Sequence, residues 1–157
     1  MEDLLNTEDP QRSLGFLLHD CMRLMRRQFM AHIQDMGLTL AQAQLLAHLS
    51  RLPGATQAML AEQLEIQPIS VARLVDKIVE HGWIEKRPHP TDRRAVRLYL
   101  TAAAEPILKT LWERASKARA VALAGLSESQ REAMIEGLLQ MKHNLTEKVA
   151  SSDEQAA

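Results

Sequence analysis

The sequence predicts a mainly α-helical protein with one small β-hairpin, and three observations support this fold class. Apolar residues recur at steps of three and four over most of the chain, which is the period of an amphipathic helix. The pattern changes to alternation in residues 83–87 and 96–100, which flank the turn-rich stretch PHPTDRRA. The chain holds eight Met but only 3% aromatic residues, a composition that favours helices over sheets.

The first predicted helix covers about 25 residues, roughly twice the mean helix length in globular proteins, and Gly37 ends it. A helix of this length is expected to pack against something beyond its nearest neighbours in the chain. Its apolar positions are Leu14, Leu17, Leu18, Cys21, Met22, Met25, Phe29, Ile33 and Met36.

Three shorter helices follow. The second begins after Thr39, which forms a capping box with Gln42, and ends at the Pro-Gly pair 53–54. The third runs from about residue 56 to 64, and the fourth from about residue 68 to 81. The fourth helix has Pro at its first position and is followed by a Gly, which suits a left-handed stop.

The third and fourth helices are separated by about three residues, EIQ, which is the spacing of a helix-turn-helix. The turn position that usually holds Gly is Glu65 here. Either Glu65 adopts a left-handed conformation or the turn differs from the usual one.

The predicted hairpin follows directly and has a basic tip. Five of the chain's 19 basic residues lie within residues 86–97 with only Asp92 to balance them, in a chain of net charge -1. A helix-turn-helix followed by such a hairpin predicts a winged helix, whose second helix enters the major groove of DNA while the tip contacts phosphates and the minor groove. The alternative is a solvated charged loop. The five residues are Lys86, Arg87, Arg93, Arg94 and Arg97.

Two long helices close the chain. The first is expected to be capped by Thr101 and to run to about residue 125, with Pro106 removing one backbone hydrogen bond near its start. A capping box of Ser127 and Gln130 opens the second, which runs to about residue 149.

Apolar residues on these two helices cover more surface than one small domain can bury. At roughly 25 cal/mol per Å² of buried apolar area, burial of this surface between two subunits would dominate the stability of a dimer. Two-fold symmetry would then place the two recognition helices about one DNA turn, ~34 Å, apart. The apolar residues are Leu108, Leu111, Trp112, Ala115, Val121, Leu123, Met134, Ile135, Leu138, Leu139, Met141, Leu145 and Val149.

Composition excludes several classes of protein. A chain of 157 residues with 46% apolar and 25% charged residues fits one globular domain, or one subunit that completes its core by pairing with a copy. The acidic N-terminal stretch MEDLLNTEDPQR lacks the pattern of a secretory leader, so secretion is not expected, and no apolar run approaches the ~20 residues of a membrane span. A single cysteine, Cys21, excludes an internal disulfide framework and fits a reducing compartment. A cytoplasmic protein that contacts no membrane is expected.

The stretches TDRRAVRLYLT and ISVARLVDKIVEHGWIEKR resemble the MarR family of winged-helix regulators, and the resemblance covers nearly the whole chain. TDRRAVRLYLTAAAEPI and KHNL look most like its SlyA branch. The resemblance implies a transcriptional regulator that binds a near-palindromic site in double-stranded DNA as a homodimer, without a cofactor. It divides the chain into an N-terminal dimerisation helix (1–38), a winged helix-turn-helix domain (39–101), C-terminal dimerisation helices (102–150) and a disordered tail (151–157).

The resemblance also implies which residues contact DNA. On the recognition helix they are Pro68, Ile69, Ser70, Arg73 and Lys77, and in the wing they are Arg87, Asp92, Arg93 and Arg94. Arg93 and Arg94 match the wing tip, and Asp92 is similar to the acidic residue that orients the wing arginine through a charge-assisted bond. Arg87 and Arg97 could instead line the hairpin or pair with Asp92.

Relatives in this family often bind a small anionic or phenolic effector between the dimer helices and the winged domain. His19, Arg23, Arg26 and Gln42 could line such a cleft, although each is equally well explained as a helix-surface or dimer residue. An effector that favours a dimer with misplaced recognition helices would lower the affinity for DNA through its differential binding to the two states.

Part of the family senses peroxides through an early cysteine in a Leu-Cys-Phe-Leu-Leu-Tyr pattern, but residues 14–19 are LGFLLH here and lack that sulfur. Cys21 lies on the apolar face, where a buried structural thiol is expected rather than a redox switch. The six histidines have no partners at metal spacing, and no catalytic constellation is present, so neither a metal site nor an enzyme is expected. The remaining alternatives are a redox-responsive regulator that uses Cys21 and a helical dimeric protein-interaction module with a degenerate wing.

Overall fold

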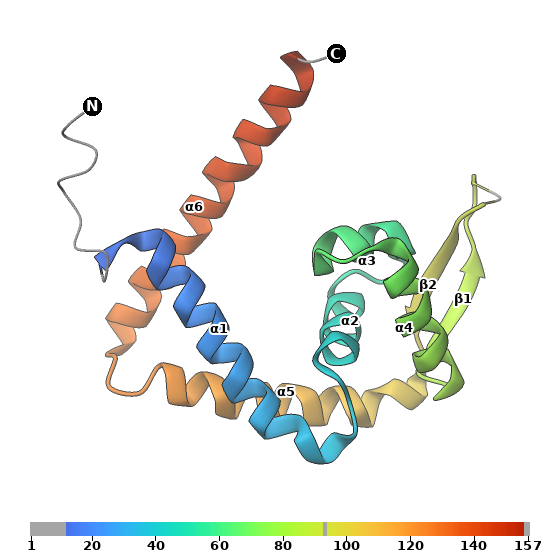
Figure 1. Cartoon of the computed structure of the whole chain (residues 1–157), viewed down its shortest axis with the longest axis horizontal. Coiled ribbons are helices and arrows are strands. Elements are labelled where there is room, and N and C mark those ends of the chain that lie inside the picture. The colour runs from blue at the N-terminus through green and yellow to red at the C-terminus, as the bar shows by residue number, and fades with distance from the viewer. Residues whose placement is uncertain (1–11, 93, 156–157) are drawn as a thin grey trace. The chain divides into compact units, whose positions relative to one another are not determined.

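The computed structural model describes residues 12–92 and 94–155, with side chains described up to residue 147. The chain divides into two compact units, residues 1–119 and residues 120–157, and each is considered by itself. The predicted fold class is confirmed: helices dominate, and one two-stranded antiparallel hairpin lies among them (Figure 1). In chain order the elements are α1 (Leu14–Ile33), the 3-10 helix η2 (Gln34–Met36), α2 (Leu40–Arg51), α3 (Gln57–Leu64), α4 (Pro68–Glu80), β1 (Ile84–Pro88), β2 (Val96–Leu100), the 3-10 helix η3 (Ala102–Ala104), α5 (Glu105–Ala122) and α6 (Glu128–Gln155).

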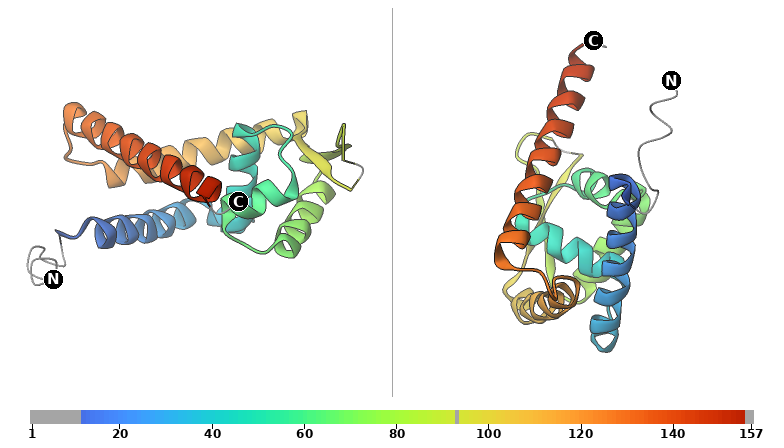
Figure 2. Two further views of the ribbon diagram at one scale, coloured as in Figure 1. Left: turned by 90° about the horizontal axis from the view of Figure 1, so that it is seen from above. Right: turned by 90° about the vertical axis from the view of Figure 1, so that its left-hand side faces the viewer.

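The core of the first unit lies between α2, α3, α4 and the hairpin, which gather into one body in each view (Figures 1 and 2). Full burial of a large apolar side chain contributes about 1.5–3 kcal/mol, so this cluster is the main source of stability for the unit. Its fully buried side chains include Leu45, Leu46, Leu49, Leu60, Val71, Val75, Ile78 and Leu98.

The predicted capping box at the start of α2 is confirmed. The Thr39 hydroxyl oxygen accepts the backbone N–H of Gln42 at 3.2 Å, and the Gln42 side-chain oxygen accepts the backbone N–H of Thr39 at 2.9 Å. The two bonds satisfy donors that the helix itself leaves without partners.

The turn between α3 and α4 contains a left-handed residue. Glu65 has φ 53° and ψ 40°, and the next residue, Ile66, donates its N–H to the carbonyl of Ala61 at 3.1 Å. This is the bond pattern of a helix that ends in a left-handed cap, a place where Gly is preferred. Of the two alternatives left open by the sequence, the left-handed one is found.

The hairpin pairs β1 with β2 in antiparallel register from Ile84 opposite Leu100 to Pro88 opposite Val96. The segment before α3 adds to the other edge of β2, which the sequence pattern did not predict. There Gly54 donates its N–H to the carbonyl of Leu98 at 2.8 Å, and Thr56 forms a bridge with Arg97.

Gly54 is required at this edge for two reasons. Its φ is 82°, a conformation that residues with a Cβ rarely adopt. A Cβ on Gly54 would also lie 2.8 Å from the hydroxyl oxygen of Tyr99, closer than such atoms approach.

The start of α5 differs from the prediction. Thr101 does not cap the helix, because its hydroxyl donates to the carbonyl of Gly82 at 2.6 Å and so joins the base of the hairpin to the end of α4. A 3-10 turn intervenes and α5 begins at Glu105, which places Pro106 at the second helical position. A residue in the first turn has no partner for its N–H, so Pro106 costs no helical hydrogen bond.

In the second unit the capping box of Ser127 and Gln130 is confirmed, with the N–H of Ser127 bonded to the Gln130 side-chain oxygen at 2.8 Å. The helix α6 continues to Gln155, beyond the expected end near residue 149 and into the segment expected to be a disordered tail. Residues 149–155 contain neither Gly nor Pro, so nothing in the local sequence stops the helix.

No helix in the described ranges is long and apolar enough to cross a membrane. Over the same ranges, no group of three or more His, Cys, Asp or Glu side chains is placed to hold a metal ion.

Candidate nucleic-acid interface

Helix α4 separates its residues into a buried side and an exposed side. Val71, Val75 and Ile78 face the core and are fully buried. Pro68, Ile69, Ser70, Arg73 and Lys77, the residues expected to contact DNA from this helix, are all exposed. The apolar residues of α4 recur at helical spacing and pack on the core, so these five residues lie on the opposite, solvent-exposed side of the helix.

The exposed side of α4 carries two cations one helical turn apart, Arg73 and Lys77. Among the described side chains neither has an acidic partner, because the nearby Asp76 is paired with Lys86 of β1 at 2.7 Å. Arg73 and Lys77 are therefore available to bind an anion such as a DNA phosphate.

Two basic residues of the hairpin are paired within the protein. Lys86 contacts Asp76, as above, and Arg87 forms an ion pair with Glu85 in which Nε donates at 2.8 Å. The guanidinium of Arg87 also lies 4.3 Å from the centre of the Tyr99 ring. Arg87, expected among the DNA contacts, thus lines the hairpin, and its acidic partner is Glu85 rather than Asp92.

Asp92 and Arg94 are connected by a hydrogen bond at the wing tip. One carboxylate oxygen of Asp92 accepts the backbone N–H of Arg94 at 2.9 Å and so fixes the backbone at Arg94. The Arg94 side chain is exposed. Arg93, the other predicted tip residue, lies outside the described residues. Arg97 is partly buried, and its Nε atom has no hydrogen-bond partner among the described groups.

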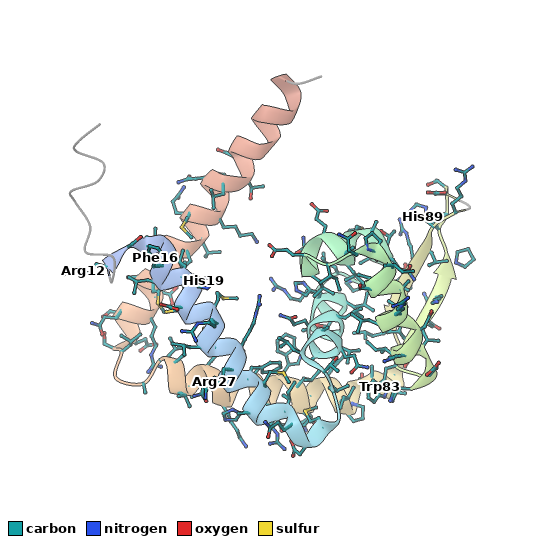
Figure 3. The ribbon with its side chains drawn as sticks, viewed as in Figure 1. Arg12, Phe16, His19, Arg27, Trp83 and His89 are labelled. Atoms are coloured by element: carbon teal, nitrogen blue, oxygen red, sulfur yellow. The ribbon has the colours of Figure 1, made fainter. Side chains whose placement is uncertain are left out.

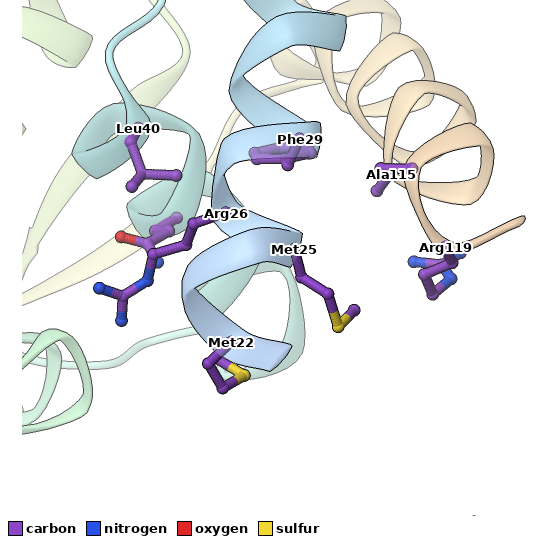
Figure 4. A pocket seen from close by; sticks show the side chains of 9 residues that line it. Met22, Met25, Arg26, Phe29, Leu40, Ala115 and Arg119 are labelled. Atoms are coloured by element: carbon purple, nitrogen blue, oxygen red, sulfur yellow. The ribbon is translucent and has the colours of Figure 1, made fainter. Parts of the chain in front are cut away.

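A cavity of about 220 Å³ lies between α1, α2 and α5 within the first unit (Figure 4). Two arginines, Arg26 and Arg119, contribute cations to a lining that is otherwise mostly apolar, and Gln44 adds an amide. The full lining is Met22, Met25, Arg26, Phe29, Leu40, Gln44, Ala115, Ala118 and Arg119.

Of the four residues expected to bind an effector, Arg26 lines this cavity and the other three do not. His19 is exposed on α1, and Arg23 is paired with Asp20 at 3.0 Å. Gln42 is 8% exposed, and its side chain is engaged in the capping box. The capping box was itself visible in the sequence, and it could have excluded Gln42 and directed attention to Gln44, two positions further along α2.

Cys21 is exposed in this chain, so the expectation of a buried thiol is wrong for the single subunit. Its helix explains the difference: α1 has one buried residue, Ile33, near its C-terminal end, and the apolar positions around Cys21 face away from the core of their own chain.

Comparison with known proteins finds a family match in this region. Residues 36–95, from the end of η2 to the wing, match the model of the MarR family. The match therefore contains α2, α3, α4 and the first strand of the hairpin.

Solved structures with the same fold cover most of the chain. A structure of MarR matches with a TM-score of 0.79 and 22% identity and covers 93% of this chain and 99% of its own. The transcriptional regulator PA3341 matches with a TM-score of 0.75 and 28% identity, over 86% of this chain and 99% of its own. BpsR from Bordetella bronchiseptica, whose DNA binding is regulated by 6-hydroxynicotinic acid, matches with a TM-score of 0.71 and 20% identity, over 87% of this chain and 98% of its own.

The SlyA branch is not singled out by these structures. A structure of the transcriptional regulator SlyA is 21% identical, with a TM-score of 0.71 over 87% of this chain and 96% of its own, which is within the range of the others. The fold they share is the predicted one, a winged helix-turn-helix with long N- and C-terminal helices.

Proposed function

We propose that this chain is a winged helix-turn-helix DNA-binding transcriptional regulator of the MarR family, whose model matches residues 36–95, and that it binds a near-palindromic operator as a homodimer. The proposed function is that of a regulator rather than an enzyme. The observation that carries the proposal is the exposed side of α4, where Arg73 and Lys77 have no acidic partner among the described residues. The assignment to the SlyA branch rests on the short sequence matches and stays a prediction.

The proposed contacts divide between the helix and the wing. The first turn of α4, with Pro68, Ile69 and Ser70 exposed, would face base edges in the major groove. Arg73 would contact bases or phosphates beside them. The wing tip, through Arg94 and the adjacent Arg93, would contact phosphates and the minor groove, where Arg tolerates the narrow and strongly negative environment.

Pairing of two subunits is proposed from the apolar side chains of the long helices. In α6 of the second unit no described side chain is buried by its own chain, and Leu139 and Leu145 are each 61% exposed. Contiguous apolar surface of this kind marks interaction sites. A two-fold dimer would match the dyad of a palindromic site.

Recovery of bound sequences from a random duplex pool by the purified full-length protein would test DNA binding and dyad symmetry together.

If the wing contacts phosphates, the logarithm of the affinity for duplex DNA should fall linearly with the logarithm of the salt concentration. Arg94→Ala should flatten the slope by about one unit per subunit, because the variant makes one phosphate contact fewer and its binding therefore releases about one counterion fewer. Lys117→Ala, which removes an exposed cation of α5, is the control and should leave the slope unchanged. No binding of the wild-type protein to duplex DNA at low salt would reject the proposed function.

We also propose that the cavity between α1, α2 and α5 binds a small anionic aromatic effector. Its lining supports this class of ligand, because Arg26 and Arg119 offer cations to a carboxylate while Phe29 and the methionines offer apolar contact. The regulation of BpsR by 6-hydroxynicotinic acid is consistent with such a ligand.

The effector proposal is tested by titrating 6-hydroxynicotinate or salicylate into the protein–DNA complex and measuring release of DNA. Arg26→Gln should bind DNA like the wild type but need about tenfold more ligand for release, as expected when a charge-assisted bond is lost. Arg27→Gln is the matched control, because Arg27 is the next residue of α1 and does not line the cavity. Equal loss of response in both variants would contradict a site at this cavity.

A further inference from the structure

His89 lies at the tip of the hairpin, directly after β1 (Figure 3), and three donors of the following residues surround one of its ring nitrogens. Its Nδ1 atom is 3.1 Å from the backbone nitrogen of Asp92 and 3.4 Å from that of Thr91. The Thr91 hydroxyl is also 3.4 Å away. Backbone N–H groups can only donate, so Nδ1 is the acceptor and the ring proton is on Nε2.

The same turn contains a second layer of hydrogen bonds. The N–H of His89 donates to the carbonyl of Ala95 at 3.2 Å, and the N–H of Ala95 donates to the carbonyl of Asp92 at 3.2 Å. The Asp92 carboxylate then accepts the N–H of Arg94 at 2.9 Å. A continuous path of hydrogen bonds therefore runs from the His89 ring through Asp92 to the backbone of Arg94.

The His89 ring has the role that Asn or Asp usually has in a turn. In an Asx turn, a side-chain acceptor bonds the N–H groups two and three residues further along the chain. His Nδ1 and Asn Oδ1 are separated from their Cα by the same number of bonds, so either can make these contacts. Pro90, the next residue, fixes one backbone torsion of the turn in advance.

The charge of the acceptor also matters at this position. Lys86, Arg87 and Asp92 line the same hollow as His89, and the two cations are already paired with Asp76 and Glu85. An Asp at position 89 would supply an acceptor but would add a second carboxylate to a tip that has to approach phosphates. A neutral imidazole supplies the acceptor without that charge.

We propose that His89 is a positioning residue of the wing, whose neutral Nδ1 holds Thr91 and Asp92, and through Asp92 the backbone of Arg94, in place before DNA is bound. A preordered tip loses less conformational entropy when Arg94 contacts DNA. The inference rests on the proposed function of the wing as a DNA contact. It predicts that position 89 requires an uncharged hydrogen-bond acceptor, which need not be an imidazole.

The test compares three variants of the full-length protein binding one duplex at one salt concentration. His89→Ala loses the acceptor and should bind about fivefold more weakly per wing, the fold-change expected for one net hydrogen bond. His89→Asn keeps a neutral acceptor and should bind within about twofold of the wild type. His89→Asp keeps the acceptor but adds charge, so it should bind more weakly than His89→Asn by a factor that shrinks as salt is raised.

A readout without DNA separates this inference from the proposed function. In mildly alkaline buffer, the ¹⁵N chemical shifts of the ring, assigned by their loss in His89→Asn, should show the proton on Nε2. A proton on Nδ1, or equal weakening by Ala and Asn, would overturn the role of His89 even if the wild type binds DNA well. If the wild type binds no DNA, the proposed function fails and so does the inferred role, whereas the tautomer still tests the hydrogen bonds at the tip.

Discussion

Glu65 has an unfavourable backbone conformation at the centre of the helix-turn-helix. With a φ of 53° it is the one non-Gly residue with positive φ in residues 12–92 and 94–155. For a residue with a Cβ, this conformation costs roughly 1–2 kcal/mol relative to the right-handed one. The turn therefore stores strain that the packing of α3 and α4 offsets.

Glu65→Gly should raise the free energy of unfolding by about 1 kcal/mol, because Gly adopts this conformation without the clash of a Cβ. Glu65→Val should lower it, because a β-branched side chain is least tolerated there. Urea denaturation at one fixed protein concentration measures both changes, since the stability of a dimer depends on concentration. A decrease for Glu65→Gly equal to that for Glu65→Val would show that the left-handed conformation is not the source of strain.

Residue-level predictions from the sequence succeeded where both partners belong to the start of one helix. The capping box of Thr39 and Gln42 spans three residues, and its geometry follows from the helix alone. The partner of Lys86, ten residues away in α4, could not be inferred because it depends on how the hairpin packs. The backbone contact of Asp92 was likewise hidden, because it depends on the local fold of the tip.

At the scale of the element, α4 shows the closest agreement between sequence and structure. One apolar period predicted both its buried side and its exposed side. The start of α5 was predicted less well, because Thr101 has a tertiary partner, the carbonyl of Gly82, that competes with its capping role. A side-chain hydroxyl that can cap a helix can also bond elsewhere, and sequence alone does not decide between the two.

The first turn of α4 presents an apolar side chain to solvent, since Ile69 is 63% exposed. In the major groove, the thymine methyl group is the apolar feature that such a side chain can contact. If Ile69 makes this contact, replacing one thymine of the selected operator by uracil should weaken wild-type binding by about 1 kcal/mol, the value of roughly one buried methyl group. Ile69→Ala should bind the two duplexes about equally, and this can be measured by competition between them.

Comparison with Lys77→Ala distinguishes base contact from a general effect on affinity. That variant removes a cation from the same side of α4 and should weaken binding to the thymine duplex and to the uracil duplex by the same factor. If replacing thymine by uracil weakens the binding of Ile69→Ala as much as that of the wild type at every position, another residue contacts the methyl groups.

At the scale of the whole molecule, the sequence indicated more apolar surface than one chain could bury, and exposed apolar side chains remain on α1, α5 and α6. The amount of this surface could be predicted, because it follows from composition and helical period. In the proposed dimer a second chain covers this apolar surface. The apolar pattern of one chain does not specify where that second chain lies.

Leu139→Asp should convert the proposed dimer to a monomer, because it places a charge at an apolar position of α6 that is 61% exposed in the single chain. The loss of simultaneous contact with two half-sites should weaken operator binding by on the order of 100-fold. Gln140→Asp, on the next residue and in an exposed position, is the matched control and should remain dimeric. Sedimentation equilibrium measures the association, and dimeric Leu139→Asp with wild-type affinity would contradict the prediction.

The segment before α3 that pairs with β2 bears on the solubility of this protein. With β1 on one side and residues 54–56 on the other, the centre of β2 is paired along both edges, whereas the sheet gives β1 a neighbouring strand on one side only. Strand β1 is short, carries Lys86 and Arg87, and ends in Pro88. Charge and proline on an edge strand block the addition of further strands. Lys86 and Arg87, which pair with Asp76 and Glu85, would thus also keep the β1 strands of neighbouring molecules from pairing with one another when several molecules bind close together on DNA.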